Sequence, residues 1–268
     1  MTPEAAATVD KLAETWGSLS EVCRALTAEQ WDLPTECPGW SVRDNVSHLI
    51  GTERGLAGQP ATSHVAPSAD WVKNPIGTAN ENEVDARRGL PGADVLAEFD
   101  EITATRLAQL RAMTDEEWTA DSWTPIGPGT LFDFLQIRIL DSWVHEQDVR
   151  RAVGVPGNLD GLAANHTIDR LVRTIPATFG RRAGAPDGAS LVFTLTGPVR
   201  RDVRLQMVDG RAQRLDAAPA DPTVRIAMDS ETFVLLATGR QPVDAVAATV
   251  AGDATLGAAV LANLNQMI

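Results

Sequence analysis

Hydrophobic residues recur every three or four positions in the first half of the chain, which is the spacing of amphipathic helices. This spacing predicts helices over residues 4–26, from residue 41 onward, over residues 93–113 and over residues 131–153. Residues 58–82 are rich in Pro, Ala and Asn and predict a long excursion between the second and third helices. Four helices joined by loops of different length indicate a bundle.

Capping residues mark where two of these helices begin. Ser41-x-x-Asp44 and Thr130-x-x-Asp133 have the spacing of a capping box, in which each side chain bonds the backbone N–H of the other residue. Gly154 is placed to end the fourth helix. These signals support the second and fourth helices independently of the hydrophobic spacing.

The pattern changes after GVPGNLDG, at residues 154–161. A helix over about residues 162–179 is followed by short alternating segments and then by two apolar helical segments. We therefore expect an α+β protein, with a helical domain over residues 1–158 and a smaller α+β domain over residues 159–268. The predicted strands lie in SLVFTLTG, DVRLQMVDG, AQRLDAAP and PTVRIAMD.

The composition limits which binding partners and which cellular compartment we expect for this protein. The net charge of −13 argues against nucleic acid and anionic membranes, which attract clustered Lys and Arg. No apolar run reaches about 18 residues, the length that a spanning helix needs, and the N-terminus has acidic groups where a signal peptide is basic and then apolar. Cys23 and Cys37 lie outside any CxxC motif, which fits a reducing compartment. We expect a cytoplasmic protein.

The segment DSWVHEQDVRRA, residues 141–152, combines acids with one of the four histidines. Asp141 and His145 are four residues apart and so share a helical face, which makes them a natural half of a divalent-metal site. Asp148 lies on roughly the same side and could accept a hydrogen bond from a ligand or act as an alternative ligand. Glu146 lies about 100° around the helix from His145 and is expected to face elsewhere. The alternative is a solvated, charged helix face.

His48 is the first candidate for a further ligand, because it lies in the middle of the second predicted helix. Leu49 and Ile50 follow it, so a hydrogen-bonded core histidine is the alternative. His64 lies in the long excursion and His166 lies near the start of the helix after residue 162, and both are weaker candidates.

Two segments together, ECPGWSVRDNVSHLIG and RILDSWVHEQDVRRAVG, closely resemble the signatures of the mycothiol-dependent, maleylpyruvate isomerase-like family of the DinB superfamily. ETFVLLATGRQP and VAGDATLGAAVLANLN are similar to the second domain of that family, which is sterol-carrier-like. The resemblance implies a DinB-like four-helix bundle followed by that α+β domain. The matching positions are Pro38, Gly39, Trp40, Ser41, Val42, Arg43, Asp44, His48, Asp141, Trp143, Val144, His145, Glu146, Gln147, Asp148 and Arg150.

The resemblance implies a divalent metal held by His48, Asp141 and His145. At the position of Asp141 the isomerase has a glutamate, and many plain DinB proteins have a histidine. An aspartate side chain is shorter than a glutamate, so its carboxylate reaches less far toward the metal, but all three side chains are suitable metal ligands. Zn²⁺ is the expected ion, and Ni²⁺, Mn²⁺ and Fe²⁺ also accept these donors. Three protein ligands leave positions open, which is the arrangement of a catalytic site.

The same resemblance implies mycothiol as a thiol cosubstrate. Its sulfur would bind the open position as a metal-bound thiolate and add to a small electrophile, either for isomerisation or for S-transfer. Arg240, in TGRQP, matches an arginine that is implied to face the metal and to meet an anionic group. Arg138 could pair with Asp141 or meet such a substrate. Arg87 and Arg88 could also bind an anionic group, but we expect them to be solvated surface residues.

Two other functions fit the same residues. The protein could bind a metal or a thiol without turnover, because fold and site do not fix function. It could also be a metal-dependent hydrolase that uses metal-bound hydroxide as its nucleophile.

Overall fold

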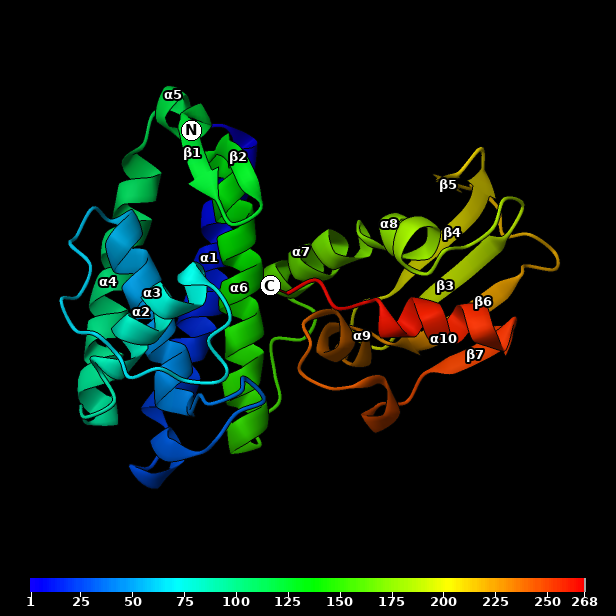
Figure 1. Cartoon of the computed structure of the whole chain (residues 1–268). Coiled ribbons are helices and arrows are strands. Elements are labelled where there is room, and N and C mark those ends of the chain that lie inside the picture. The colour runs from blue at the N-terminus through cyan, green and yellow to red at the C-terminus, as the bar shows by residue number, and fades with distance from the viewer. Residues whose placement is uncertain (268) are drawn as a thin grey trace. The chain divides into compact units, whose positions relative to one another are not determined.

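The protein divides into two compact units in a computed structural model that describes residues 1–267 (Figure 1). The first unit is Met1–Ala163 and the second is Ala164–Ile268. The sequence predicted a boundary after residue 158, and the division of the structure follows Ala163. Helices and strands are both present, so the expected mixed fold class is confirmed.

Four long helices form the first unit: α1 (Pro3–Arg24), α2 (Val42–Leu56), α4 (Gly92–Ala112) and α6 (Leu131–Val153). Helix α1 contacts α4 and α6, and α2 contacts the same two helices, so the four surround one core. The helix spacing read from the sequence therefore matches the bundle closely. Its buried apolar side chains include Leu12, Trp16, Leu49, Ile50, Phe99, Leu135 and Ile139.

The predicted caps are confirmed at both helices. The Ser41 and Asp44 side chains each accept from the backbone of the other residue, and Thr130 and Asp133 do the same at the start of α6. Gly154 follows α6 with a φ of 69°, the left-handed conformation that glycine adopts without steric cost.

The long excursion holds a helix that the hydrophobic spacing did not reveal. Helix α3 (Pro75–Asp85) begins at Asn74, whose side chain accepts from the Gly77 backbone N–H. Only Glu81 and Val84 of this helix are buried, so it has almost no apolar stripe for a sequence pattern to detect.

Short elements of the first unit were also missing from the prediction. They lie in segments that carry glycine, proline or charged residues rather than an alternating pattern. These elements are η1 (Glu29–Asp32), α5 (Asp115–Thr119) and the antiparallel hairpin of β1 (Asp121–Thr124) and β2 (Gly127–Thr130).

One buried carboxylate ties three helices of the bundle together. Glu53, on α2, is 0% exposed. Its Oε1 accepts from Nε of Arg138 on α6 at 2.9 Å, and its Oε2 accepts from Nε of Arg106 on α4 at 3.2 Å. Arg106 and Arg138 are also buried, so the Glu53 carboxylate compensates both charges within the core.

A five-stranded sheet forms the second unit, in the order β5-β4-β3-β6-β7. The pair β3–β6 is parallel and the other neighbouring pairs are antiparallel. The four predicted strands are therefore present, and β7 is an additional edge strand. The strands are β3 (Ser190–Thr196), β4 (Arg201–Val208), β5 (Arg211–Arg214), β6 (Val224–Asp229) and β7 (Thr249–Gly252).

Helices pack against this sheet, with α9 contacting β3 and β6 and α10 contacting β6 and β7. The predicted helix over residues 162–179 is interrupted, because it consists of α7, α8 and a π-helical turn η2. The bounds are α7 (Leu162–Val172), α8 (Ile175–Ala177), η2 (Thr178–Arg182), α9 (Ser230–Ala237), η3 (Val243–Ala245) and α10 (Ala254–Ala262).

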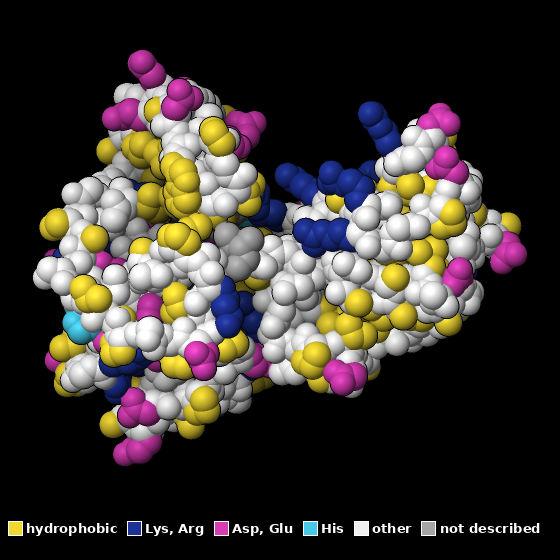
Figure 2. All heavy atoms as spheres, in the orientation of Figure 1, with side chains coloured by type: hydrophobic (Ala, Val, Ile, Leu, Met, Phe, Trp, Pro, Cys, Tyr) yellow, Lys and Arg dark blue, Asp and Glu magenta, His cyan; other side chains and the backbone are white. Residues whose placement is uncertain are grey.

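Positive side chains gather over the α7–α8 segment on the face shown in Figure 2. Exposed arginines here include Arg173, between α7 and α8, and Arg181 and Arg182 of η2. The negative charge of the whole chain therefore coexists with a local basic surface on the second unit.

Within residues 1–267, no helix is both long and apolar enough to cross a bilayer. The longest, α6, has 23 residues, but it carries charged side chains along its length.

We predict that Glu53→Gln destabilises the protein by about 3–5 kcal/mol, because it removes the buried carboxylate that Arg106 and Arg138 share and leaves Arg138 with Asp141 alone. The free energy of unfolding from urea denaturation measures the effect. Glu101→Gln, at an exposed position of α4, is the matched control and is expected to change stability by less than about 0.5 kcal/mol. Equal effects of the two substitutions would contradict the role of Glu53.

Candidate metal centre

A tight turn precedes α2 and positions one wall of the candidate site. The backbone N–H of Trp40 donates to the carbonyl of Cys37 at 3.0 Å, and Gly39 has a φ of 77°. Pro38 and Gly39 occupy the two central positions, which is the combination that a type II turn favours. The Trp40 ring therefore reaches the helices, where its centroid lies 5.1 Å from that of His48.

Three potential metal ligands converge from two helices. His48 lies on α2, whereas Asp141 and His145 lie one turn apart on α6. Nε2 of His48 is 3.2 Å from Oδ2 of Asp141, and Nε2 of His145 is 3.7 Å from Oδ1 of Asp141. One ligand atom from each residue lies within 4.8 Å of the other two. The structure thus brings together the three side chains that the sequence singled out.

Asn45 determines which nitrogen of His145 carries a proton. The Asn45 amide donates to Oγ1 of Thr35 at 3.0 Å and to the carbonyl of Ser41 at 2.8 Å, which uses both of its N–H groups. Its oxygen, 2.7 Å from Nδ1 of His145, must therefore accept from that nitrogen. Nε2 is left with a lone pair that faces Asp141 and is available to a metal.

Arg138 holds the Asp141 carboxylate in its ionised form. Removal from water alone would raise the pKa of Asp141, but the Arg138 guanidinium and the two neighbouring histidines hold that pKa well below its usual range. Nη1 of Arg138 donates to Oδ2 of Asp141 at 2.5 Å. Of the two roles expected for Arg138, the structure shows the pairing with Asp141.

His48 is suited to act as a neutral ligand. Burial is the main cause that lowers the pKa of His48, so its ring is uncharged near neutral pH. A neutral imidazole is the form that binds a metal. Within residues 1–267, Nδ1 of His48 is buried and has no hydrogen-bond partner.

The donor set fits a divalent ion. A tetrahedral Zn²⁺ site with bonds of about 2.0–2.2 Å places neighbouring ligand atoms about 3.3–3.6 Å apart. The two histidine Nε2 atoms lie 3.2 Å and 3.7 Å from the two different oxygens of Asp141, which is close to those values. His48, Asp141 and His145 could therefore hold such an ion with small adjustments of their side chains.

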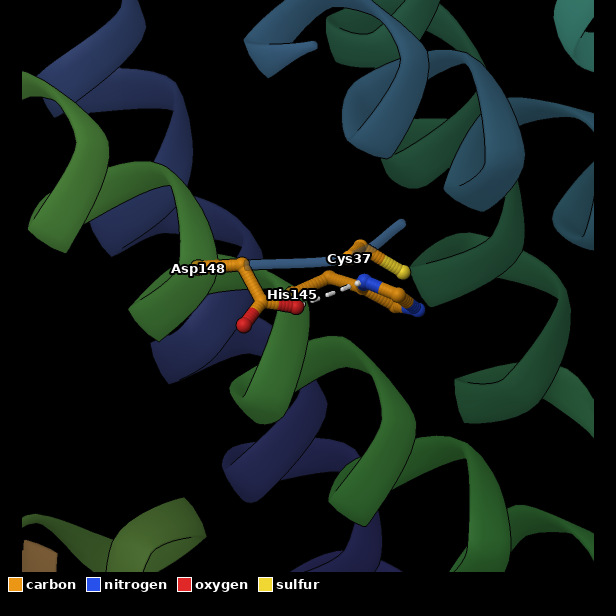
Figure 3. A group of neighbouring side chains, drawn as sticks. All are labelled: Cys37, His145 and Asp148. Atoms are coloured by element: carbon orange, nitrogen blue, oxygen red, sulfur yellow. Dashed lines mark ion pairs between the residues drawn. The ribbon is translucent and has the colours of Figure 1, made fainter. Parts of the chain in front are cut away.

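A second group shares His145, and its cysteine was not predicted from the sequence. Cys37, His145 and Asp148 each offer a ligand atom within 4.8 Å of the other two (Figure 3). Oδ2 of Asp148 is 3.2 Å from Nδ1 of His145, and the Cys37 sulfur lies beside the same ring. The sequence shows that Cys37 lies in the turn before the helix of His48. It does not show that Cys37 approaches α6, because that contact depends on how the helices pack.

The two cysteines differ in their surroundings. Cys37 is partly exposed, whereas Cys23 is 2% exposed on the inner face of α1. Burial raises the pKa of the Cys23 thiol to about 12, with smaller contributions from Asp100 and Glu146. Cys23 is consequently an inert core residue.

Glu146 points away from the candidate site and forms hydrogen bonds within the core of the first unit. It accepts hydrogen bonds from Thr15, Ser18, Arg150 and Asn158 at 2.6–2.8 Å. Burial raises its pKa in spite of these bonds. This orientation agrees with the sequence prediction, which placed Glu146 about 100° around the helix from His145.

Arg87 and Arg88 belong to ion pairs instead of a solvated surface. Arg87 is 6% exposed and binds Glu83 and Glu98, so its predicted exposure is wrong. Arg88 is partly exposed and pairs with Glu81. The reason is that α3, which the sequence did not reveal, supplies several of the acidic partners.

The remaining candidates are His64, His166 and Arg240. His64 is half-exposed, and its Nε2 lies 2.6 Å from Oδ2 of Asp85. His166 lies on α7. Arg240 follows α9, where its Nη1 donates to the carbonyl of Thr238 at 3.1 Å, and its expected role toward an anionic group stays a prediction.

Comparisons with known proteins agree with this architecture. An uncharacterized protein of Mycobacterium tuberculosis, in strains CDC 1551 / Oshkosh and ATCC 25618 / H37Rv, is 25% identical over 233 residues, which cover 85% of this chain and 83% of the relative. The crystal structure of mycothiol-dependent maleylpyruvate isomerase matches with a TM-score of 0.56 and 17% identity, covering 90% of this chain and 93% of that one. A mutant of that isomerase gives a TM-score of 0.55 at 16% identity, with the same coverage. These structural matches show a shared fold.

The family model described as the mycothiol maleylpyruvate isomerase N-terminal domain matches residues 12–150. This segment is more than half of the 268 residues and contains His48, Asp141 and His145. The resemblance expected from the two sequence signatures is confirmed. The chain therefore belongs to the mycothiol maleylpyruvate isomerase N-terminal domain family.

Proposed function

We propose that this protein is a divalent-metal-dependent enzyme that activates a low-molecular-weight thiol, mycothiol, as the nucleophile toward a small, electrophilic and anionic substrate. The reaction is either isomerisation of that substrate or S-transfer to it. The observation that carries the proposal is the convergence of His48, Asp141 and His145, with Nε2 of both histidines facing the carboxylate.

The three residues would hold the ion and leave part of its coordination sphere to a substrate or cosubstrate. Two imidazoles and one carboxylate suit Zn²⁺ and also accept Ni²⁺, Mn²⁺ or Fe²⁺. When bound, such an ion supplies a Lewis acid that favours thiolate over thiol at neutral pH. Membership of a family named for a mycothiol-dependent isomerase supports a thiol as the cosubstrate.

Residues around the three ligands fix their orientation and their charge. Asn45 and Asp148 face Nδ1 of His145 and fix the orientation of its ring. Arg138 keeps Asp141 ionised and holds one of its oxygens in place. The ring centroid of Trp40 lies 5.1 Å from that of His48 and 5.8 Å from that of His145, so the indole packs against both imidazoles.

We propose that Arg240 binds the anionic group of the electrophile. Its planar guanidinium offers two parallel donors that match a carboxylate. The support for this role is the match of TGRQP to the family sequence.

Replacement of His145 by Ala is expected to abolish stoichiometric metal binding, because it removes one of three ligands. Elemental analysis of the purified variant, after removal of unbound metal, measures the loss. His64→Ala is the matched control, since His64 lies outside the group and pairs with Asp85. Undiminished metal in the His145 variant would rule out this ligand set.

Titration of the Co²⁺-substituted protein with mycothiol is expected to change the visible d–d spectrum of the metal and to add a sulfur-to-cobalt charge-transfer band. A spectrum that mycothiol leaves unchanged would contradict the proposed function and would favour hydrolysis. A spectral change without consumption of maleylpyruvate or another electrophile would instead indicate a protein that binds the thiol without turnover.

Arg240→Ala is expected to raise KM for maleylpyruvate about tenfold or more, because a charge-assisted hydrogen bond contributes about 1.5–3 kcal/mol. Steady-state kinetics measures the change, and metal content is expected to stay constant. Arg181→Ala, at an exposed position of η2, is the control and should leave KM unchanged. An unaltered KM in the Arg240 variant would refute its role.

A further inference from the structure

We propose that Cys37, His145 and Asp148 form a second metal site, selective for thiophilic cations, that competes with the first group for His145. The donors come from the turn before α2 and from one face of α6 (Figure 3). This site differs from the first in having a sulfur donor, and it uses neither His48 nor Asp141.

The geometry brings three different donor atoms together. Sulfur, nitrogen and oxygen atoms of the three residues all lie within 4.8 Å of one another. Oδ2 of Asp148 and Nδ1 of His145 are 3.2 Å apart, close to the separation of about 3.3 Å for neighbouring N and O ligands of a tetrahedral ion. Asp148 is 0% exposed and His145 is 6% exposed, so two of the three donors are fixed in the core.

The donor types determine which ions this site would prefer. A thiolate is a soft ligand that selects Zn²⁺ and related thiophilic ions over Mg²⁺, Ca²⁺ or Mn²⁺. Cysteine, histidine and aspartate together provide the S, N and O ligands found in zinc sites. The expected occupant is therefore a thiophilic divalent cation, for which Cd²⁺ is a spectroscopic probe.

The two groups exclude each other because they need opposite nitrogens of one ring. The first group uses the lone pair of Nε2, and Asn45 then accepts the proton of Nδ1. The second group faces Nδ1, so binding there moves that proton to Nε2 and releases the thiol proton of Cys37 to solvent. A neutral imidazole carries one proton, and it cannot offer both lone pairs at once.

Occupation of the second site also disturbs existing contacts. It breaks the 2.7 Å hydrogen bond between His145 and Asn45. The 2.8 Å ion pair between Oδ1 of Asp148 and Arg151 is retained, because it uses the other carboxylate oxygen. We therefore expect an added thiophilic ion to take His145 for the second site only when it is in excess over the ion held by the first group.

The consequence is inhibition by an excess of thiophilic ions. A cation held by Cys37 takes His145 from the first group and leaves that group with two ligands. This consequence rests on the proposed function, whereas the existence of the second site rests on its own donors and can be tested separately.

The test is a Cd²⁺ titration of the metal-stripped, full-length protein, followed by near-ultraviolet absorbance and elemental analysis. A cadmium–thiolate charge-transfer band is expected in the wild type. Cys37→Ser is expected to lose the band and to weaken the Cd²⁺ affinity of this site by more than the roughly 10–100-fold that loss of an outer-shell partner costs. Cys23→Ser is the matched control and is expected to keep the band, because Cys23 is a buried core residue.

A further variant separates the two groups. Asp141→Asn is expected to keep the cadmium–thiolate band, since Asp141 belongs to the first group alone. No band in the wild type, or an undiminished band in Cys37→Ser, would overturn the proposal. Loss of the band in Asp141→Asn would also overturn it, because the sulfur would then belong to the first group. Circular dichroism of each variant confirms that its fold is intact.

Discussion

The candidate site depends on one buried carboxylate. Glu53 is removed from water and is paired with Arg106 and Arg138, so it fixes α2, α4 and α6 with respect to one another. Arg138 extends this ion network to Asp141, one of the three potential ligands. A buried charge tolerates little displacement of its partners, and the bundle core therefore sets the position of a carboxylate at the site. The ion pairs of Glu53 therefore contribute both to the stability of the bundle and to the position of Asp141.

The second constraint is the hydrogen-bonding of Asn45, which joins the turn before α2 to His145. The Asn45 amide donates twice to the turn and its oxygen accepts from Nδ1, so one side chain orients the ring and selects the tautomer. His145 therefore belongs to two groups of potential ligands, one with only nitrogen and oxygen donors and one that includes a sulfur donor. The tautomer favours the nitrogen and oxygen ligands of the first group, while the sulfur of Cys37 remains close enough to compete.

Much of this architecture follows from local sequence. The four long helices and two capping boxes could be predicted because apolar spacing and cap residues act within a few positions. His48, Asp141 and His145 were identified by spacing together with a family resemblance. The roles of Cys37, Glu53 and Asn45 could not be predicted, because each depends on a contact between segments that are distant in sequence. Helix α3 was missed for a related reason, since its few buried residues leave no apolar stripe.

We propose that nitrogen and oxygen atoms of His48, Asp141 and His145 hold the functional metal. X-ray absorption spectroscopy of the protein loaded with one equivalent of Zn²⁺, without added thiol, tests it most directly. The expected spectrum has a first coordination shell of nitrogen and oxygen at about 2.0–2.2 Å that includes two imidazoles. A sulfur ligand at about 2.3 Å in this thiol-free sample would rule out this ligand set, because it would place the functional metal on Cys37.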